Sequence, residues 1–192
     1  MLRDLILANR SYRRFHQEEP IAETVLLQLV DLARLTASAG NLQPLKYILS
    51  TSPATNARIF PCLRWAAYLK EWAGPEEGER PSAYIVILHD TRISQSSGSD
   101  QGIAAQSILL GAAERGLGGC IIASIDRDGL REALAIPGHL EIPLVLALGR
   151  PKEEVLLETT GPSGDIKYWR DTAGVHHVPK RPLEEIIVLK KT

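Results

Sequence analysis

The sequence contains very little cysteine. Cys62 and Cys120 are the two cysteines among 192 residues, and neither belongs to a Cys-x-x-Cys pair. We therefore expect no disulfide framework and no thiolate zinc site. An excess of one charge is also missing, because 22 basic residues face 23 acidic ones, a formal net charge of -1. This balance gives no overall field that would gather nucleic acid or an anionic membrane, so neither is expected as a partner.

Long apolar runs are missing as well. No apolar run reaches the roughly 20 residues that a membrane helix needs. The opening MLRDLILANR places Asp4 inside its short apolar run and has no small-residue cleavage site, so it does not read as a signal peptide. These features predict a cytoplasmic protein. At 192 residues and 44% hydrophobic composition, the chain is expected to form a single domain over residues 1–192 with its own core.

The signatures of several enzyme classes are absent. The sequence has no Gly-x-Ser-x-Gly elbow, no His-Glu-x-x-His helix and no glycine fingerprint of a dinucleotide or P-loop site. His176 and His177 are adjacent, a spacing that is poor for joint metal ligation on a strand. The acidic run of Glu76, Glu77 and Glu79 is read as a solvated loop. We therefore expect no metal site and no side-chain nucleophile.

Apolar spacing predicts helices and strands in mixed order. Helices are expected at 2–9, 21–37, 56–72, 101–118 and 127–136, and strands at 46–50, 83–90, 118–124, 142–151 and the end of the tail 178–191. Such a mixture indicates a layered α/β or α+β domain, and the pattern alone leaves parallel and antiparallel pairing open.

The helix expected at 101–118 has an unusually wide apolar face. Asp100 is placed to cap it, and its many glycines and alanines would let another backbone approach closely. A helix of this kind is buried at the centre of a domain or at a subunit interface.

Two polar motifs are candidate binding elements. The stretch NRSYRRF places Arg10, Ser11, Arg13 and Arg14 close together, and guanidinium groups with a hydroxyl suit a phosphate. The alternative is a solvated basic turn. The loop SAGNLQP carries Ser38, Asn41 and Gln43, which could hydrogen-bond the edge of a ring system, or simply satisfy the backbone of their own turn.

Two further motifs lie later in the chain. In GLGGCIIAS the glycines are explained by the end of a helix, which leaves Ala123 and Ser124 at the far end of the following strand. In VPKRP the prolines hold Lys180 and Arg181 extended, so the two side chains are expected to point in opposite directions and at most one of them to reach a ligand.

Four stretches, in this order, resemble the nitroreductase family of FMN-dependent oxidoreductases. They are RSYRRF, SAGNLQP, DQGIAAQSILLGAAERGLGGC and VPKRPLEEII, which together span nearly the whole chain. The resemblance implies an α+β fold, a three-layer α/β/α sandwich with a mostly antiparallel central sheet, closed as an intertwined homodimer with flavin sites at the subunit interface. Asn9 and Ala37 depart from the family pattern, which often has a basic residue and a proline at these places.

The resemblance also assigns site residues. Arg10, Ser11 and Arg13 match the opening that meets the flavin phosphate and pyrimidine edge, and Lys180 with Arg181 matches the basic pair that closes over the phosphate. Ser38, Asn41 and Gln43 match a loop that meets the flavin from the partner subunit, and Ala123 and Ser124 match the strand end whose backbone N–H points at flavin N5.

The activity implied is that of an FMN-dependent NAD(P)H oxidoreductase. Hydride would pass from NADH or NADPH through flavin N5 to a nitroaromatic, a quinone or a similar small-molecule acceptor by a ping-pong mechanism. Two alternatives stay open: an FMN-binding carrier or sensor with little turnover, and an anion-binding interaction domain whose arginines serve a partner protein.

Overall fold

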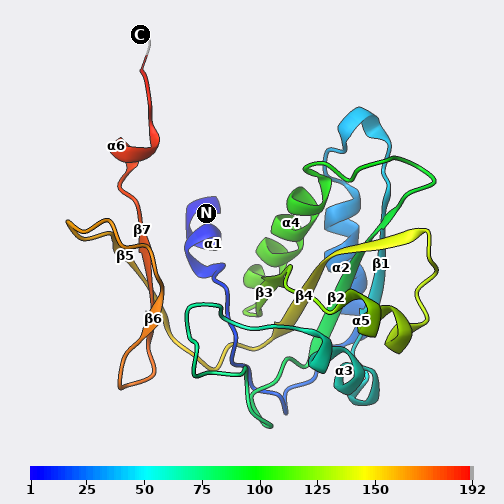
Figure 1. Cartoon of the computed structure of the whole chain (residues 1–192), viewed down its shortest axis with the longest axis horizontal. Coiled ribbons are helices and arrows are strands. Elements are labelled where there is room, and N and C mark those ends of the chain that lie inside the picture. The colour runs from blue at the N-terminus through cyan, green and yellow to red at the C-terminus, as the bar shows by residue number, and fades with distance from the viewer. Residues whose placement is uncertain (191–192) are drawn as a thin grey trace. The chain divides into compact units, whose positions relative to one another are not determined.

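The computed structural model of the protein describes residues 1–190 and divides into two compact units (Figure 1). The first unit comprises residues 1–65 and 73–152, and the second comprises residues 66–72 with the chain from residue 153 onward. Each unit has its own sheet.

The sheet of the first unit has four strands in the order β1-β2-β4-β3, and every neighbouring pair is antiparallel. This resolves the pairing question that the sequence pattern left open. The strands are β1 Leu45–Ser50, β2 Ala83–Asp90, β3 Gly118–Ile122 and β4 Leu140–Gly149. All eight residues of β2 are buried. A central strand covered on both faces reads as a continuous apolar run rather than an alternating one.

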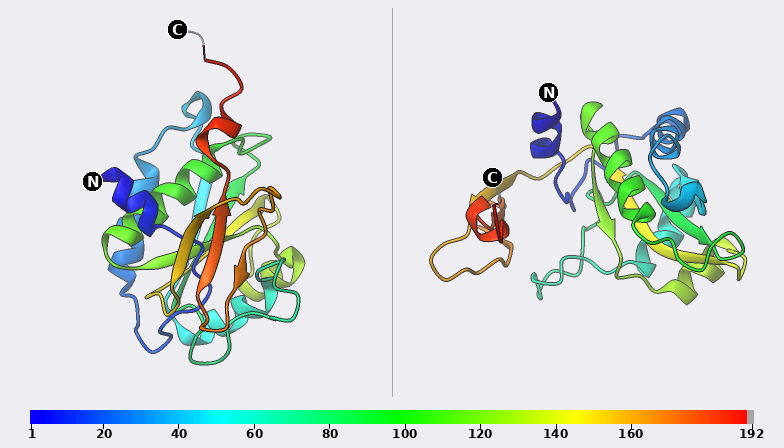
Figure 2. Two further views of the ribbon diagram at one scale, coloured as in Figure 1. Left: turned by 90° about the vertical axis from the view of Figure 1, so that its left-hand side faces the viewer. Right: turned by 90° about the horizontal axis from the view of Figure 1, so that it is seen from above.

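Helices cover both faces of this sheet (Figure 2). On one face α2 (Glu23–Arg34) and α4 (Asp100–Glu114) pack with Ile85 and Ile87 of β2 in one apolar cluster. On the other face Tyr84 lines a pocket together with residues of α3 (Pro53–Ile59), and α3 lies against α5 (Arg127–Leu134). Successive residues of a strand point to opposite faces, so β2 serves both layers.

The remaining helix of the first unit, α1 (Leu2–Ala8), lies beside α4 (Figure 1). Asn9, which ends α1, donates from its side-chain amide to Gln106 of α4 at 3.5 Å. The chain after α1 is irregular, and it carries the basic motif.

The second unit contains a three-stranded sheet in the order β5-β7-β6. β5 (Val155–Thr159) runs parallel to β7 (His176–Lys180), and β6 (Trp169–Arg170) pairs antiparallel with β7. The His177 ring stacks on Trp169 with centroids 4.0 Å apart. A short helix, α6 (Leu183–Ile186), follows β7.

The helix expected at 56–72 is wrong in extent. α3 ends at Ile59, and a 3-10 turn at Phe60–Cys62 replaces its continuation. Pro61 lies in that turn and has no N–H for a helical hydrogen bond, which is the physical reason for the break. Ala66 has a positive φ of 40°, which is incompatible with a continuing helix.

Two smaller expectations also need correction. Ser99 occupies the N-cap position of α4, and Asp100 is the first helical residue. The strand of the tail lies earlier than expected, in β7, whereas residues 183–186 are helical and 187–190 are irregular. Glu184 and Glu185 lie in the first turn of α6, where acidic side chains favour helix formation. Lys191 lies outside the described residues.

Within residues 1–190, no helix has the length and apolar character needed to cross a membrane.

Candidate functional site

The basic motif is held against the edge strand β3. Ser11 forms a parallel bridge with Gly119, and the Tyr12 N–H donates to the Gly119 carbonyl at 3.0 Å. A Cβ on Gly119 would lie 2.7 Å from the carbonyl oxygen of Ala147 in β4, and one on Gly118 would collide with the Tyr12 ring. The two glycines therefore allow the motif and β4 to approach β3 closely.

The three arginines of the motif have different surroundings. Arg14 is engaged by the carboxylate of Glu79, and buried Arg13 donates from its guanidinium to the Ser11 carbonyl at 3.1 Å. Arg10 donates to the Ile6 carbonyl at 2.5 Å, but its buried Nε has no hydrogen-bond partner among the described residues. Burial lowers the pKa of Arg10 from its ordinary value. Among the three arginines of the motif, Arg10 is thus the one whose Nε–H is buried without a hydrogen-bond acceptor among the described residues.

The polar loop at 38–44 is held by hydrogen bonds on its buried side and is exposed to solvent on the other side. A 3-10 turn spans Ala39–Asn41, and Asn41 and Gln43 have positive φ of 53° and 52°. A left-handed conformation costs a non-glycine residue roughly 1–2 kcal/mol. The loop is held by Asp100, which accepts hydrogen bonds from the Ser38 hydroxyl at 2.6 Å and the Ala39 N–H at 3.0 Å.

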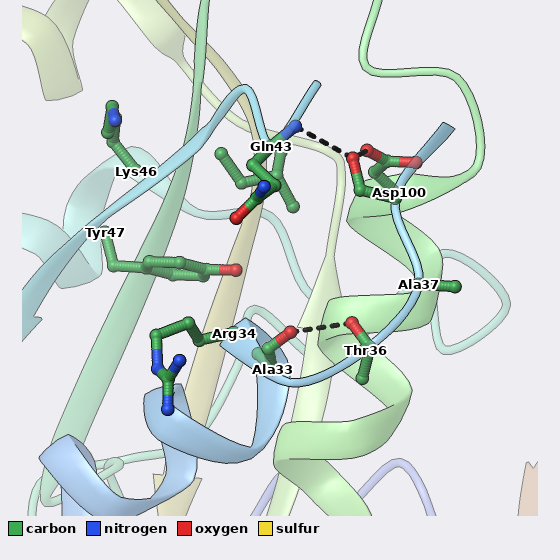
Figure 3. Close-up of a pocket in the computed structure, with 10 residues that line it drawn as sticks. Ala33, Arg34, Thr36, Ala37, Gln43, Lys46, Tyr47 and Asp100 are labelled. Carbon is green, nitrogen blue, oxygen red and sulfur yellow. Dashed lines mark hydrogen bonds between the residues drawn. The ribbon is translucent and has the colours of Figure 1, made fainter. Parts of the chain in front are cut away.

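A cavity of about 230 Å³ opens beside this loop. Figure 3 shows Gln43, Tyr47 and Asp100 around it, with Arg34 and Lys46 farther out. Burial raises the pKa of Tyr47, and the nearby Asp100 carboxylate adds to that effect. The cavity is polar and carries groups of both charge signs.

The strand end at Ala123 and Ser124 is exposed. Arg127 donates to the Ala123 carbonyl at 3.2 Å, and the Arg64 N–H donates to the Ser124 carbonyl at 3.0 Å. Both carbonyl groups are therefore engaged, and the segment has a defined shape where β3 ends.

Lys180 and Arg181 belong to the second unit, where they end β7 and precede α6. Both are exposed, and the Arg181 guanidinium donates to Glu185 at 3.2 Å. Lys180 pairs with Thr159 in the parallel ladder, which gives it the extended backbone that the flanking prolines predict.

The structure brings some of these segments together. In the first unit it joins the basic motif to β3, the strand that leads to Ala123 and Ser124. The loop at 38–44 is instead joined to the start of α4 through Asp100.

Sequence reasoning missed two residues that shape the site. Asp100 reads as a helix cap, and its hydrogen bonds to the loop connect positions 62 and 61 residues apart. Glu79 reads as part of a solvated acidic run, yet it binds Arg14 from 65 residues away. For Asp100, an acidic residue that follows a polar stretch and begins an apolar helix is a weak local signal of this role. For Glu79, the neighbouring residues give no signal of its contact with Arg14.

One group of possible metal ligands occurs among the described residues. His16, Glu18 and Glu19 bring ligand atoms within 4.8 Å of one another. His16 pairs with Glu18 at 3.1 Å, and Glu19 is paired with Arg150. All three groups are partly exposed and each already has an ion-pair partner, so the cluster gives no support for a metal role.

The comparisons with known proteins agree with this fold. The sequence pattern of the nitroreductase family matches residues 6–150, so the chain belongs to that family. A Thermus thermophilus protein named NADH dehydrogenase is 26% identical over 193 residues, which cover 85% of this chain and 93% of the relative.

Two solved structures show the same fold. An FMN-dependent nitroreductase from Clostridium difficile R20291 has a TM-score of 0.66 at 22% identity, covering 78% of this chain and 87% of the other. A nitroreductase family protein from Streptococcus pneumoniae TIGR4 has a TM-score of 0.71 at 15% identity, covering 99% and 100%. The expected α+β nitroreductase fold is therefore confirmed.

Proposed function

We propose that this protein is an FMN-dependent oxidoreductase that takes hydride from NADH or NADPH and reduces a nitroaromatic, a quinone or a similar electron-poor acceptor. Membership of the nitroreductase family supports the reaction class. The Thermus thermophilus relative named NADH dehydrogenase supports the donor, and the Clostridium difficile structure described as FMN-dependent supports the cofactor.

The observation that carries the proposal is the environment of Arg10. Its buried Nε lacks a partner among residues 1–190, and a buried donor left unpaired costs free energy that a bound anion would recover. Next to it the Ser11 side chain is exposed and free to donate. A guanidinium with an unused N–H beside a hydroxyl suits the oxygens of a phosphate group.

The chain direction of β3 supports a ligand longer than a phosphate. Ser11 pairs with Gly119, and Ala123 follows four residues later. At about 3.3 Å per residue this is a distance of about 13 Å along the strand. We assign the phosphate to Arg10, Ser11 and Arg13, and the ring to the strand end at Ala123 and Ser124.

The remaining assigned residues complete the site. Lys180 and Arg181 would add positive charge around the phosphate, and Ser38, Asn41 and Gln43 would meet the flavin bound to the partner subunit. FMN, when bound, supplies the N5 atom that accepts a hydride and passes it on in a separate half-reaction. The chain itself binds and orients the cofactor, and positive charge near the pyrimidine edge favours the reduced ring.

A homodimer and a single functional domain are parts of the same proposal. α1 exposes Leu2, Ile6 and Leu7, and the second unit exposes Leu183 and Ile186, which are surfaces that a partner subunit could cover. The Streptococcus pneumoniae structure matches 99% of this chain, which supports one functional domain over the full length. Light scattering during gel filtration measures the oligomeric state, and a monomer that retains FMN would contradict the dimer.

The test of function begins with the visible absorption spectrum of the purified protein after incubation with FMN and removal of the unbound cofactor. A bound flavin band that bleaches on anaerobic addition of NADH or NADPH supports a reductase and identifies its donor. A bound flavin that stays oxidised with both donors favours the carrier or sensor. Absence of bound flavin rejects the proposal and leaves the anion-binding interaction domain.

The acceptor and the kinetic order are tested in a second step. Initial rates measured at several donor and acceptor concentrations should give parallel double-reciprocal lines, as a ping-pong mechanism requires, with a nitroaromatic or a quinone as acceptor. Intersecting lines would contradict the two separate half-reactions.

A further inference from the structure

Asp100 connects the polar loop to the central helix of the first unit. It is the first residue of α4, and only 5% of its surface is exposed. Its Oδ2 accepts from the Ser38 hydroxyl at 2.6 Å, and its Oδ1 accepts from the Ala39 N–H at 3.0 Å. Figure 3 shows Asp100 at the start of α4, on the side that faces the loop carrying Gln43. Both oxygens of a buried carboxylate are thus used on the loop.

The same hydrogen bonds close the loop. The Ser38 hydroxyl donates its one proton to Asp100, so its lone pairs remain for the Gln43 N–H, which donates to it at 2.9 Å. Ser38 and Gln43 stand at the two ends of the turn, and the carboxylate sets the direction of both bonds. The left-handed backbone at Asn41 and Gln43 depends on such a tie, because the conformation is unfavourable on its own.

The tie leaves the other side of the loop presented to solvent. Asn41 and Gln43 are exposed, and the Gln43 amide donates to the Asn41 side-chain oxygen at 3.2 Å. Asn41 and Gln43, two of the three loop residues that the family resemblance assigns to the flavin, therefore share one fixed arrangement, which the hydrogen bonds of Asp100 hold from the buried side.

We infer that Asp100 is a positioning residue for the flavin-facing loop, acting through Ser38 and without contact to the cofactor. This inference rests on the proposed function, because it assumes that the loop meets FMN. A carboxylate is required at this position: an amide would offer one acceptor to Ala39 and one donor to Ser38, which reverses the direction of the Ser38 hydrogen bond and weakens its acceptance from Gln43.

The experiment compares Asp100→Asn, Ser38→Ala and the double variant with the wild-type protein. All four proteins are used in the oligomeric state in which they are purified. FMN dissociation constants are measured by quenching of flavin fluorescence without any turnover, and kcat and KM are measured separately. Each single change should weaken FMN binding roughly tenfold, the usual effect of losing one hydrogen bond to a charged group. Both changes break the same connection. The FMN dissociation constant of the double variant should therefore lie within about twofold of that of the single variant with the larger loss.

Asp90→Asn is the matched control. Asp90 is also a buried aspartate, with 4% of its surface exposed, and it pairs with Arg92 at a strand end outside the loop. We expect it to lower the thermal midpoint of unfolding while leaving the FMN dissociation constant unchanged. If Asp100→Asn is too unstable to isolate, Ser38→Ala alone tests the connection from the side of the loop.

The outcomes separate the two levels of the argument. If wild-type protein binds no FMN, the proposed function fails, and this inference fails with it. If wild-type protein binds FMN but Asp100→Asn and Ser38→Ala bind it equally well, the positioning role is wrong and the proposed function stands. A strictly additive double variant would also contradict the inference.

Discussion

Arg14 and Glu79 form a two-pronged ion pair in which Arg14 Nε lies 2.5 Å from one carboxylate oxygen and its NH2 lies 2.6 Å from the other. Lys152 approaches the same carboxylate at 3.3 Å. The third arginine of the basic motif therefore connects the N-terminal segment to the loop before β2. This leaves Arg10 and Arg13 as the arginines assigned to a ligand.

We expect Arg14→Ala to lower the free energy of unfolding by about 1–2 kcal/mol, because it leaves a partly buried carboxylate without its main partner. Urea unfolding measures the change. Arg150→Ala is the control, since Arg150 and Glu19 are both about half exposed and an exposed pair contributes roughly 0–1 kcal/mol. Equal losses in the two variants would contradict a special role for the Arg14 pair.

The same pair makes stability depend on pH. The Arg14 hydrogen bonds, with Lys152 adding to them, hold the pKa of Glu79 below its ordinary value. A lowered carboxyl pKa contributes stability above the unfolded pKa, roughly 4.3, and loses it as the pH falls through the folded pKa. Urea unfolding at pH 6 and pH 3 should therefore show a smaller acid-induced loss in Glu79→Gln than in the wild-type protein.

Arg10→Ala tests the phosphate assignment. Removing one charge-assisted partner should weaken FMN binding about tenfold to a hundredfold. Flavin fluorescence quenching gives the dissociation constant, and Arg3→Ala, an exposed arginine of α1, is the matched control. An unchanged dissociation constant in Arg10→Ala would remove this residue from the site.

His177 should titrate above its ordinary pKa. The hydrogen bond from its Nδ1 to Glu158 at 2.5 Å raises the pKa, and Asp171 at 3.4 Å from Nε2 adds to the effect. The resulting stability is present in full below about pH 6.5 and is lost as the pH rises through the folded pKa. An NMR titration of the imidazole signals, assigned with His177→Gln, measures it.

Two variants dissect that titration. Glu158→Gln should lower the His177 midpoint more than Asp171→Asn, because the Glu158 hydrogen bond is the shorter of the two. A midpoint at or below 6.5 in the wild-type protein would show that the two carboxylates do not act on the ring.

Gly119→Ala tests the close packing at β3. The added methyl group would lie 2.7 Å from the Ala147 carbonyl oxygen and 2.6 Å from Leu109, so we expect a loss of about 1–3 kcal/mol in stability. Gly138→Ala is the control, because nothing lies within 4 Å of its added Cβ, and its effect should stay within about 0.5 kcal/mol. Thermal unfolding of both variants measures the difference.

The sequence by itself determined the elements whose signals are local. The apolar run of β2, the helical spacing of α2 and α4 and the turn residues of the loop at 38–44 each depend on neighbouring residues, and all three lie where the pattern predicts them. The family resemblance also follows from motifs that can be read in order along the chain, and the match to residues 6–150 confirms it.

Tertiary structure decided what depends on distant contacts. The antiparallel order β1-β2-β4-β3 is set by strand pairing across the sheet, which periodicity does not encode. The separate environments of Arg10, Arg13 and Arg14 arise because Glu79, 65 residues from Arg14, neutralises one of them. The role of Asp100 likewise depends on a loop 62 residues away, since a carboxylate acquires its function from the donors that folding places around it.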